Sequence, residues 1–437
     1  MGDQKDLDSD KDISSFLEEG KKCGGLSSKP IVCFKIPERD LFSPLLIIPL
    51  AFLLFLSLAF ISYLLDLLDF PSIRTPLAII FSLFLFIMSV RLCEKIPLKF
   101  IADFRFQLTI LVLIFLFVSF AILKLYHSLF IGVLIGIVFS MILNYGLNIH
   151  SREVPKKIPI ALVLVSISIL IFYFIFLGGF PLLSERLRER ANLSIVRAFS
   201  YMSFIYGFSI IVSCEKNNKF SISLALIGLL LFSLLGFRFE PMGILLTLTM
   251  AYWYRDLLSR KAMLLSLILL AAVIVVVGYM KVPSQWILNP IETLFYRAGF
   301  TLNTLDRILE IAYPFGLTHG LASFSPPRSR IVIGLMVYGY NQSITSTLIG
   351  AAFLDFGLFG IVLIMIYFGL MLGIGYKILK NNPSYWCSII GYLLAASHSL
   401  ILIESGVDFT MWLFTLFVWL LYGKFSNLLT EEQLVEG

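Results

Sequence analysis

Long apolar runs separated by short polar stretches dominate the pattern along the chain. Many runs reach the roughly 18 residues that cross about 30 Å of hydrocarbon as a helix. They are apolar on all sides, whereas the strands of a membrane β-barrel alternate between apolar and polar residues. The pattern therefore predicts an all-α, polytopic integral membrane bundle of about 12 transmembrane helices. The spans are expected at roughly 41–65, 76–93, 107–124, 128–146, 158–178, 193–214, 220–236, 238–254, 263–281, 357–379, 385–404 and 409–424.

Composition and charge agree with this pattern and set the expected orientation. The chain is 59% hydrophobic and 14% charged, against roughly 25% charged residues in a soluble domain. Most of the 34 Lys and Arg residues fall in alternate inter-span segments, which are typical of the cytosolic side. This distribution places both termini in the cytosol of a multi-pass cell-membrane protein. The scatter of basic residues between spans argues against nucleic-acid binding, and cysteines in or near cytosolic segments predict no structural disulfide.

Three segments of different character follow from these spans. Residues 1–40 are polar and mixed in charge, which predicts a flexible cytosolic tail without a cleavable signal peptide. Residues 41–425 form the integral membrane domain, and residues 426–437 form a second cytosolic tail. Within the domain, residues 282–342 are expected as a long external loop, and loops of this length usually carry binding or catalytic groups. No Walker loop is present in the sequence, which argues against an ATPase.

Arginines on the expected external side oppose the orientation rule, so function is a reason for their presence. A guanidinium group donates paired hydrogen bonds and suits a pyrophosphate or sugar phosphate. Arg238 stands in a tight break between two apolar runs, where an Arg needs an ion-pair partner or a polar cavity. Its alternative roles are an internal pair with Glu240 or a side chain that reaches toward water. The expected substrate-binding residues are Arg186, Arg188, Arg190, Arg197, Arg238 and Arg297.

The run from Arg186 to Arg190 is interleaved with glutamates and also fits an ordinary solvated helix. The expected external segment 282–342 contains three further arginines besides Arg297, which are Arg307, Arg328 and Arg330.

For proton transfer, the external side offers one histidine and a few carboxylates. Histidine as a residue type suits proton transfer, and His319 lies in a loop rich in turn residues, so it is the candidate catalytic base, with a solvated loop histidine as the alternative. Asp355 is interpreted as a structural cap in preference to a cavity carboxylate. No cofactor and no metal site is expected, because the remaining histidines lack a second ligand at metal spacing. The other carboxylates are Glu292, Asp306, Glu310, Glu404 and Asp408.

Three motifs in order resemble a known family. They are Gly-Gly-Phe-Pro-Leu-Leu at 178–183, Gly-Phe-Arg at 236–238, and Thr-Ser-Thr-Leu-Ile-Gly at 345–350 followed by Asp-Phe-Gly-Leu-Phe-Gly at 355–360. Together with the span count and the late external segment, they resemble the oligosaccharide repeat unit polymerases, the Wzy-type O-antigen polymerases. The likeness covers most of residues 40–425.

The resemblance implies a GT-C-like, metal-independent glycosyltransferase of the cell envelope that polymerises lipid-linked oligosaccharide repeat units on the outer face of the membrane. The growing glycan would leave its polyprenyl pyrophosphate when a hydroxyl of the incoming unit attacks. Arg238 would bind the pyrophosphate, assisted by Arg186, Arg188, Arg190 or Arg297. Polyprenyl-pyrophosphate-linked oligosaccharides, membrane lipid, a flippase and a chain-length regulator are the expected partners, and nucleic acid is not.

Three other functions remain open from the sequence. A GT-C enzyme that uses a polyprenyl-monophosphate sugar would hold a metal in its first external loop, where Asp66 and Asp69 lie, but this loop is short. An O-antigen ligase would differ from a polymerase in the acceptor. A transporter or flippase for a lipid-linked or small anionic substrate would place charges along a mid-membrane pathway, whereas most charges here lie near the ends of the spans.

Overall fold

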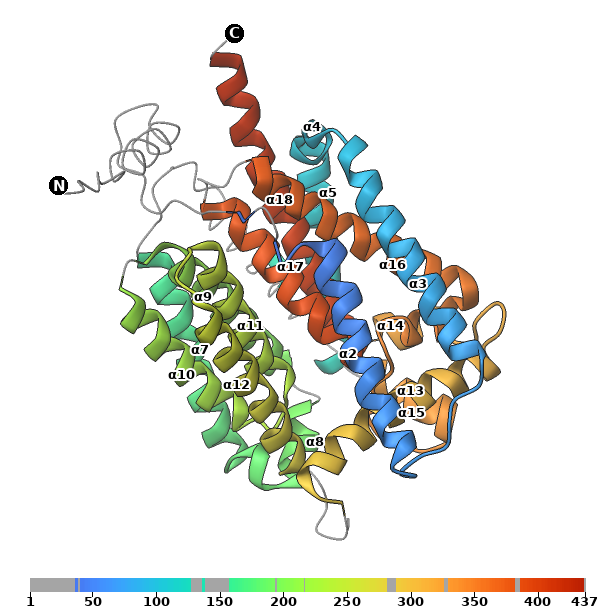
Figure 1. Cartoon of the computed structure of the whole chain (residues 1–437). Coiled ribbons are helices and arrows are strands. Elements are labelled where there is room, and N and C mark those ends of the chain that lie inside the picture. Colours follow the sequence, from blue (N-terminus) through green and yellow to red (C-terminus); the bar gives the residue numbers. More distant parts are fainter. Residues whose placement is uncertain are drawn as a thin grey trace, which may run out of the picture.

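The helical content of the bundle is visible throughout the described chain (Figure 1). The computed structural model describes residues 36–37, 40–126, 136–137, 157–192, 195–215, 217–280, 288–325, 329–381 and 386–435. Within these ranges every regular element is a helix and no strand occurs. Seven helices in this part are long and apolar enough to cross a membrane. The prediction of an all-α polytopic membrane protein is confirmed.

The long helices follow the predicted apolar runs closely. The predicted span at 128–146 lies almost entirely outside the described residues. The helices that match the other predicted spans are α2 (Pro44–Leu64), α3 (Arg74–Leu92), α5 (Phe104–Tyr126), α7 (Lys157–Leu177), α9 (Ile195–Cys214), α10 (Asn218–Ser233), α11 (Phe239–Tyr254), α12 (Arg260–Tyr279), α16 (Gly350–Asn381), α17 (Trp386–Ser405) and α18 (Phe409–Val435).

The remaining helices, all short except α13, complete the fold and gather mainly at one end. They are η1 (Cys93–Lys95), α4 (Leu98–Ala102), η2 (Pro181–Leu183), α8 (Glu185–Asn192), α13 (Pro290–Ile311), α14 (Leu321–Phe324) and α15 (Ser329–Tyr338). In Figure 1, α8 and α13 to α15 lie at the lower end, opposite the C-terminal end of α18. The predicted long external loop is thus largely helical in its described part. Its main helix, α13, is capped by Asn289, whose side chain accepts hydrogen bonds from the backbone N–H groups of Ile291 and Glu292.

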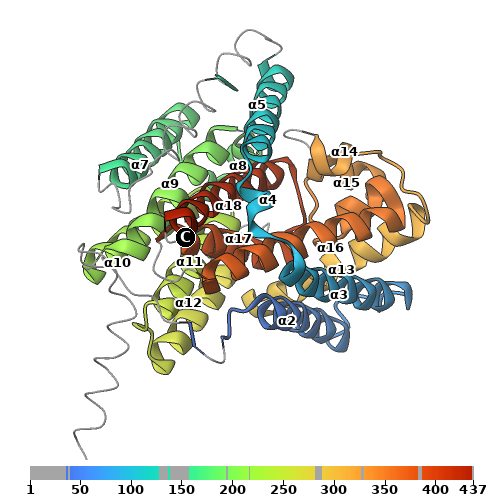
Figure 2. The ribbon, with the colours of Figure 1, turned by 90° about the horizontal axis from the view of Figure 1, so that it is seen from above.

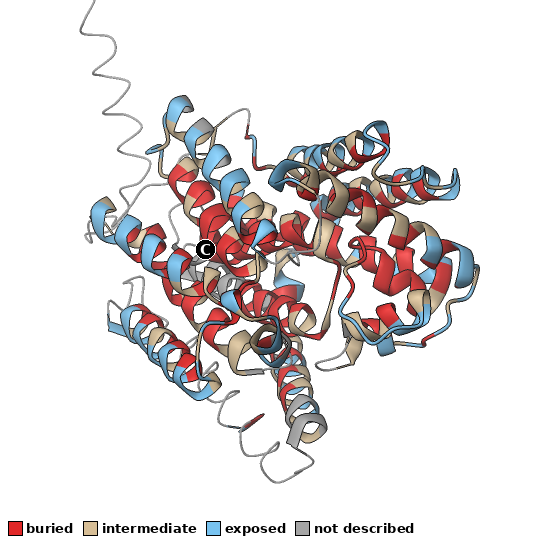
Figure 3. Cartoon of the chain, turned by 90° about the horizontal axis from the view of Figure 1, so that it is seen from below, coloured by how far each residue is buried: buried red, intermediate tan, exposed pale blue. Residues whose placement is uncertain are grey.

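Buried residues gather on the central helices and exposed residues on the peripheral ones (Figure 3). Seen from above, α17 lies near the centre of the bundle and α7 at its edge (Figure 2). In the 18-residue apolar stretch of α17, 83% of the residues are buried, against 28% in the corresponding stretch of α7. Helix α7 packs on α9, α3 packs on α16, and α2 packs on α13. The outward faces of these peripheral helices carry large apolar side chains such as Phe172 and Phe176, which are 72% and 85% exposed. Such faces are stable against lipid and costly against water, so the peripheral layer is the lipid contact.

The end of α11 that lies far from α8 is anchored by a buried carboxylate. Asp40 is 7% exposed and accepts hydrogen bonds from the Tyr254 hydroxyl at 2.9 Å and the Trp253 indole at 3.3 Å. The backbone N–H of Phe42 donates to the same carboxylate at 3.0 Å. Since a buried carboxylate is stable only when it is hydrogen-bonded, this network fixes the C-terminal end of α11 and thereby the position of its N-terminal end.

Helix α16 begins before the predicted span and bends at Gly357. Gly357 has φ 59°, and the N–H of Leu358 donates to the Pro314 carbonyl at 3.0 Å. A side chain at Gly357 would overlap that carbonyl. The bend thus seats the segment after α13 directly on α16, a contact that the local sequence pattern does not predict.

Asp355, just before this bend, is a structural residue, as the sequence favoured. Its carboxylate accepts from the Thr318 hydroxyl at 2.6 Å and from the N–H groups of Gly320, Ala322 and Ser323 at 2.9, 2.9 and 2.8 Å. The carboxylate therefore caps α14, and not the helix that follows Asp355 in sequence.

Candidate functional site

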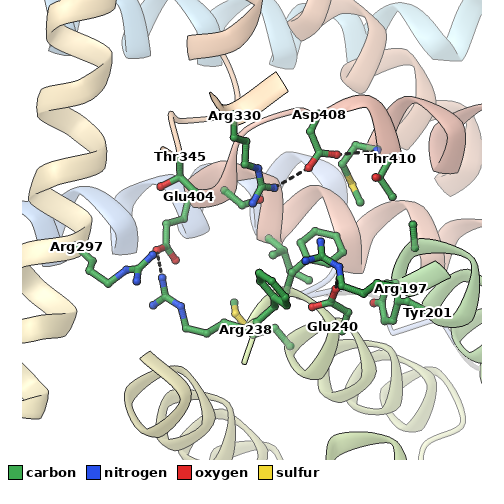
Figure 4. Close-up of a pocket in the computed structure, with 17 residues that line it drawn as sticks. Arg197, Tyr201, Arg238, Glu240, Arg297, Arg330, Thr345, Glu404, Asp408 and Thr410 are labelled. Carbon is green, nitrogen blue, oxygen red and sulfur yellow. Dashed lines mark hydrogen bonds and ion pairs between the residues drawn. The ribbon is translucent and has the colours of Figure 1, made fainter. Parts of the chain in front are cut away.

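A polar pocket opens among helix ends at the end of the bundle that carries α13 and α15. Its volume is about 740 Å³, counting the space at its open mouth. Helices α9, α11, α13, α15, α17 and α18 contribute to its wall (Figure 4). The charged residues of the lining are Arg197, Arg238, Arg297, Arg330, Glu240, Glu404 and Asp408.

Arg238 enters the pocket from the turn between α10 and α11. Gly236 has φ 75°, which favours glycine and allows the chain to reverse there. Arg238 is the N-cap residue of α11, and its side chain is 10% exposed. Its Nη2 donates to Glu404 Oε1 at 2.8 Å. The partner is thus Glu404 on α17 and not Glu240, the internal partner considered from the sequence.

Arg297 approaches the same place from α13. In the part of the chain that the structure describes, its side chain has no ion pair within salt-bridge distance. The neighbouring Arg238 charge and burial lower the pKa of Arg297 to about 10, against the opposing effect of Glu404. Two guanidinium groups held this close repel each other, so the site favours a bound anion.

Arg197, near the start of α9, is the third arginine of the pocket lining. Its Nε lies 3.1 Å from Glu240 Oε1, and the Glu240 side chain is 3% exposed. The Arg197 guanidinium also stacks 3.9 Å above the centre of the Phe237 ring. This cation–π contact and the ion pair fix the guanidinium plane against α11.

Arg330 on α15 is the fourth arginine of the pocket lining and forms an ion pair with Asp408. Their Nη2 and Oδ2 atoms are 3.0 Å apart, and the other Asp408 oxygen accepts from the Met411 N–H at 3.1 Å. Asp408 therefore holds Arg330 and caps the start of α18 at once. From the sequence, Arg330 was placed in the external basic segment 282–342 but was not chosen as a substrate-binding residue. Its position in the same segment as Arg297 was the sequence feature that could have indicated it.

The pocket as a whole is electropositive. Four arginines against three carboxylates give a formal net charge of +1 (4 − 3) for the lining. The first turns of α11 and α18 also end at the pocket, and helix N-termini carry partial positive charge. The site can therefore hold a multiply charged anion if one or more internal ion pairs exchange for it.

Tyr201, which lines the pocket from α9, connects it to a buried histidine. The Tyr201 hydroxyl lies 2.9 Å from His398 Nε2, and His398 Nδ1 lies 2.9 Å from the Leu394 carbonyl. A carbonyl can only accept, so Nδ1 carries the hydrogen and Nε2 accepts from tyrosine. His398 is 1% exposed, so this hydrogen bond lies inside the bundle.

The other arginines expected at the site lie on α8, outside the pocket lining. Arg186 and Arg190 are exposed. Arg188 donates from Nη1 to the Leu182 carbonyl at 3.0 Å and packs against Gly236. Arg188 thus stabilises the turn that carries Arg238. The substrate contacts expected of Arg186, Arg188 and Arg190 stay predictions.

His319, the expected catalytic base, is exposed in the loop before α14 and does not line the pocket. Its backbone N–H donates to the Asp355 carbonyl at 3.3 Å. Its catalytic role stays a prediction. Among the described residues, no group of three or more His, Cys, Asp or Glu side chains is placed to hold a metal ion.

Comparison with known proteins identifies the family. A family profile described as "Putative O-antigen polymerase" matches residues 40–415. An uncharacterized protein of Methanocaldococcus jannaschii is 29% identical over 368 residues, which is 83% of this chain and 88% of that protein. A second uncharacterized protein of the same organism is 27% identical over 258 residues, 57% of this chain and 70% of its own length. No solved structure matches the chain. The family match spans most of the sequence, and the chain belongs to the O-antigen polymerase family.

Proposed function

We propose that the protein polymerises lipid-linked oligosaccharide repeat units on the outer face of the membrane. The glycan would be transferred from a polyprenyl-pyrophosphate carrier to a hydroxyl of the incoming unit. Family membership supports a polymerase role in a membrane. The observation that carries the proposal is the convergence of Arg197, Arg238, Arg297 and Arg330 from four separate elements on one pocket.

The residues of the pocket suit the chemistry of this transfer. The acceptor oxygen forms a bond to the anomeric carbon of the donor, and the bond from that carbon to the pyrophosphate oxygen breaks. Negative charge grows on the leaving pyrophosphate. Arg238 and Arg297 lie where they can donate to it, and donors already fixed in place stabilise such charge at low reorganisation cost. The acceptor proton goes to a base, for which the candidates are His319 and, in the lining, Glu240 and Asp408.

The proposed sidedness follows from the basic residues between the spans. With both termini in the cytosol, the segments at the α13 end of the bundle face outward. Flipped lipid-linked repeat units would then reach the pocket from the outer leaflet. Helix α12, whose Gly278 lies beside the Arg238 side chain, carries exposed apolar residues such as Ile268 and Val276 that offer a lipid contact for the polyprenyl chain.

Glycan analysis of a strain that lacks the gene tests the proposal. The expected result is a surface polysaccharide reduced to one repeat unit, restored to full chain length by the wild-type gene. A deletion strain that still makes full-length chains but fails to join them to their final acceptor would indicate a ligase instead. Unchanged surface glycans would contradict both and favour transport.

A further inference from the structure

Glu404 occupies a place in the pocket that differs from that of the other two carboxylates. It is the second-last residue of α17, and its Oε1 lies 2.8 Å from Arg238 Nη2. Arg297 and Arg330 also interact with it electrostatically. In Figure 4 the side chains of Arg238, Arg297 and Glu404 point toward one another. One carboxylate thus lies where two converging guanidinium groups favour an anion.

Glu240 and Asp408 are fixed more firmly. Glu240 is 2% exposed and tied to Arg197, whose guanidinium is itself stacked on Phe237. Asp408 uses one oxygen for Arg330 and the other for the start of α18. The side chain of Glu404, in contrast, is 28% exposed, and within the described residues its one hydrogen-bonded partner is Arg238.

Glu404 also stands directly before a chain reversal. Gly406 has φ 72°, and a side chain there would overlap the Ser346 carbonyl. The backbone at the end of α17 is therefore held in place, while the flexible glutamate side chain above it can turn away from Arg238.

We propose that Glu404 is an internal counter-anion that holds Arg238 and Arg297 together in the empty pocket, yields them to a diphosphate group, and returns to expel the spent lipid pyrophosphate. This inference rests on the proposed function, since it assumes that the pocket takes a diphosphate. Glu404 acts here as a positioning residue through the arginines and not through contact with the reacting atoms.

The proposal predicts that a higher affinity for the diphosphate is accompanied by slower turnover. A competing internal anion weakens binding of the external one, because each must replace the other on the same donors. Glu404→Gln keeps the shape but removes the charge, so the diphosphate should bind about 10- to 100-fold more tightly, the range of one charge-assisted contact. Release of the lipid pyrophosphate should slow, so kcat and KM should fall together.

The test uses the full chain in lipid nanodiscs, with inorganic pyrophosphate as the probe and calorimetry as the readout. The variants are Glu404→Gln and the control Glu185→Gln, an exposed acid on α8 at the same end of the bundle. The control changes the net charge equally but leaves the pocket intact, so its affinity should equal that of the wild type. Inorganic phosphate in a parallel titration distinguishes a diphosphate site from a general anion site.

The proposal is supported if Glu404→Gln binds pyrophosphate more tightly than the wild type and Glu185→Gln does not. If the wild type and Glu404→Gln bind pyrophosphate with equal affinity, the proposal is overturned while the proposed function stands. If neither protein binds pyrophosphate, the proposed function fails as well. If Glu404→Gln does not fold, Glu404→Asp serves instead. Its shorter side chain withdraws the carboxylate from Arg238, and it should bind pyrophosphate more tightly than the wild type. Unchanged affinity in that variant overturns the proposal.

Discussion

Replacement of Arg238 by lysine removes a hydrogen-bonding fork and keeps a positive charge. Arg238 is the N-cap residue of α11, and the aliphatic part of its side chain lies beside Gly278 of α12. A lysine side chain fits the same space, and its ammonium group can still meet Glu404. The change is therefore specific to the paired donation that a diphosphate requires.

The magnitude follows from the contact that is lost. One hydrogen bond to a charged group contributes about 1.5–3 kcal/mol. In the transition state, loss of one fixed donor lowers the rate by about 10² to 10³. Because the Arg238 side chain is only 10% exposed, water cannot easily take the place of the missing N–H. We expect polymerisation by Arg238→Lys to fall by about 10²-fold or more, below the level at which polymer is detected.

The assay is complementation of the deletion strain, with polysaccharide chain length as the readout and membrane-extracted protein as the measure of insertion. Arg238→Lys should insert normally and leave single repeat units. The matched control is Arg74→Lys, an exposed arginine at the start of α3, whose neighbour Thr75 hydrogen-bonds Asp306 of α13 at 2.7 Å. The control should give full-length chains. Normal chain length in Arg238→Lys would refute the assignment of the guanidinium fork to the substrate.

Three further predictions concern the frame around the pocket, each measured by thermal unfolding of the purified protein in detergent. Asp355→Ala should cost about 3 kcal/mol or more, because four hydrogen bonds to one carboxylate are lost; an unchanged melting temperature would show that α14 is held by other contacts. Gly357→Ala should destabilise strongly, because its Cβ overlaps the Pro314 carbonyl, and wild-type stability would exclude the bend in α16. Asp40→Ala should cost about 1–3 kcal/mol, because buried donors of Trp253 and Tyr254 lose their acceptor, and a neutral effect would argue against this anchor of α11.

The membrane helices were predictable from the sequence because lipid imposes a length and an apolar character on each of them. The boundaries of α16 were not, because its first turns are set by contacts with the distant segment at Pro314 and not by local hydropathy. In the same way, the helices within residues 282–342 are amphipathic or short and do not stand out as spans. Their helical form depends on caps such as Asn289 and on packing against α2 and α16.

The candidate site was predictable in part. Arg238 stood out because a tight break near hydrocarbon makes an arginine costly, and Arg197 and Arg297 stood out because they oppose the expected charge asymmetry. Their partners could not be found, because Arg238 and Glu404 are 166 residues apart in sequence. The alternating charges around Arg186 fit a solvated helix and a binding loop equally well, and only the three-dimensional position of α8 separates it from the pocket lining.

The central claim is that the lipid diphosphate binds between Arg238 and Arg297, and its most direct test is an experimental structure with a short-chain polyprenyl diphosphate in a lipid nanodisc. The claim predicts the two phosphate groups within hydrogen-bond distance of both guanidinium groups, with the Glu404 carboxylate moved away from Arg238. Phosphate groups bound on α8 or at any other place, with the Arg238–Glu404 pair intact, would contradict it.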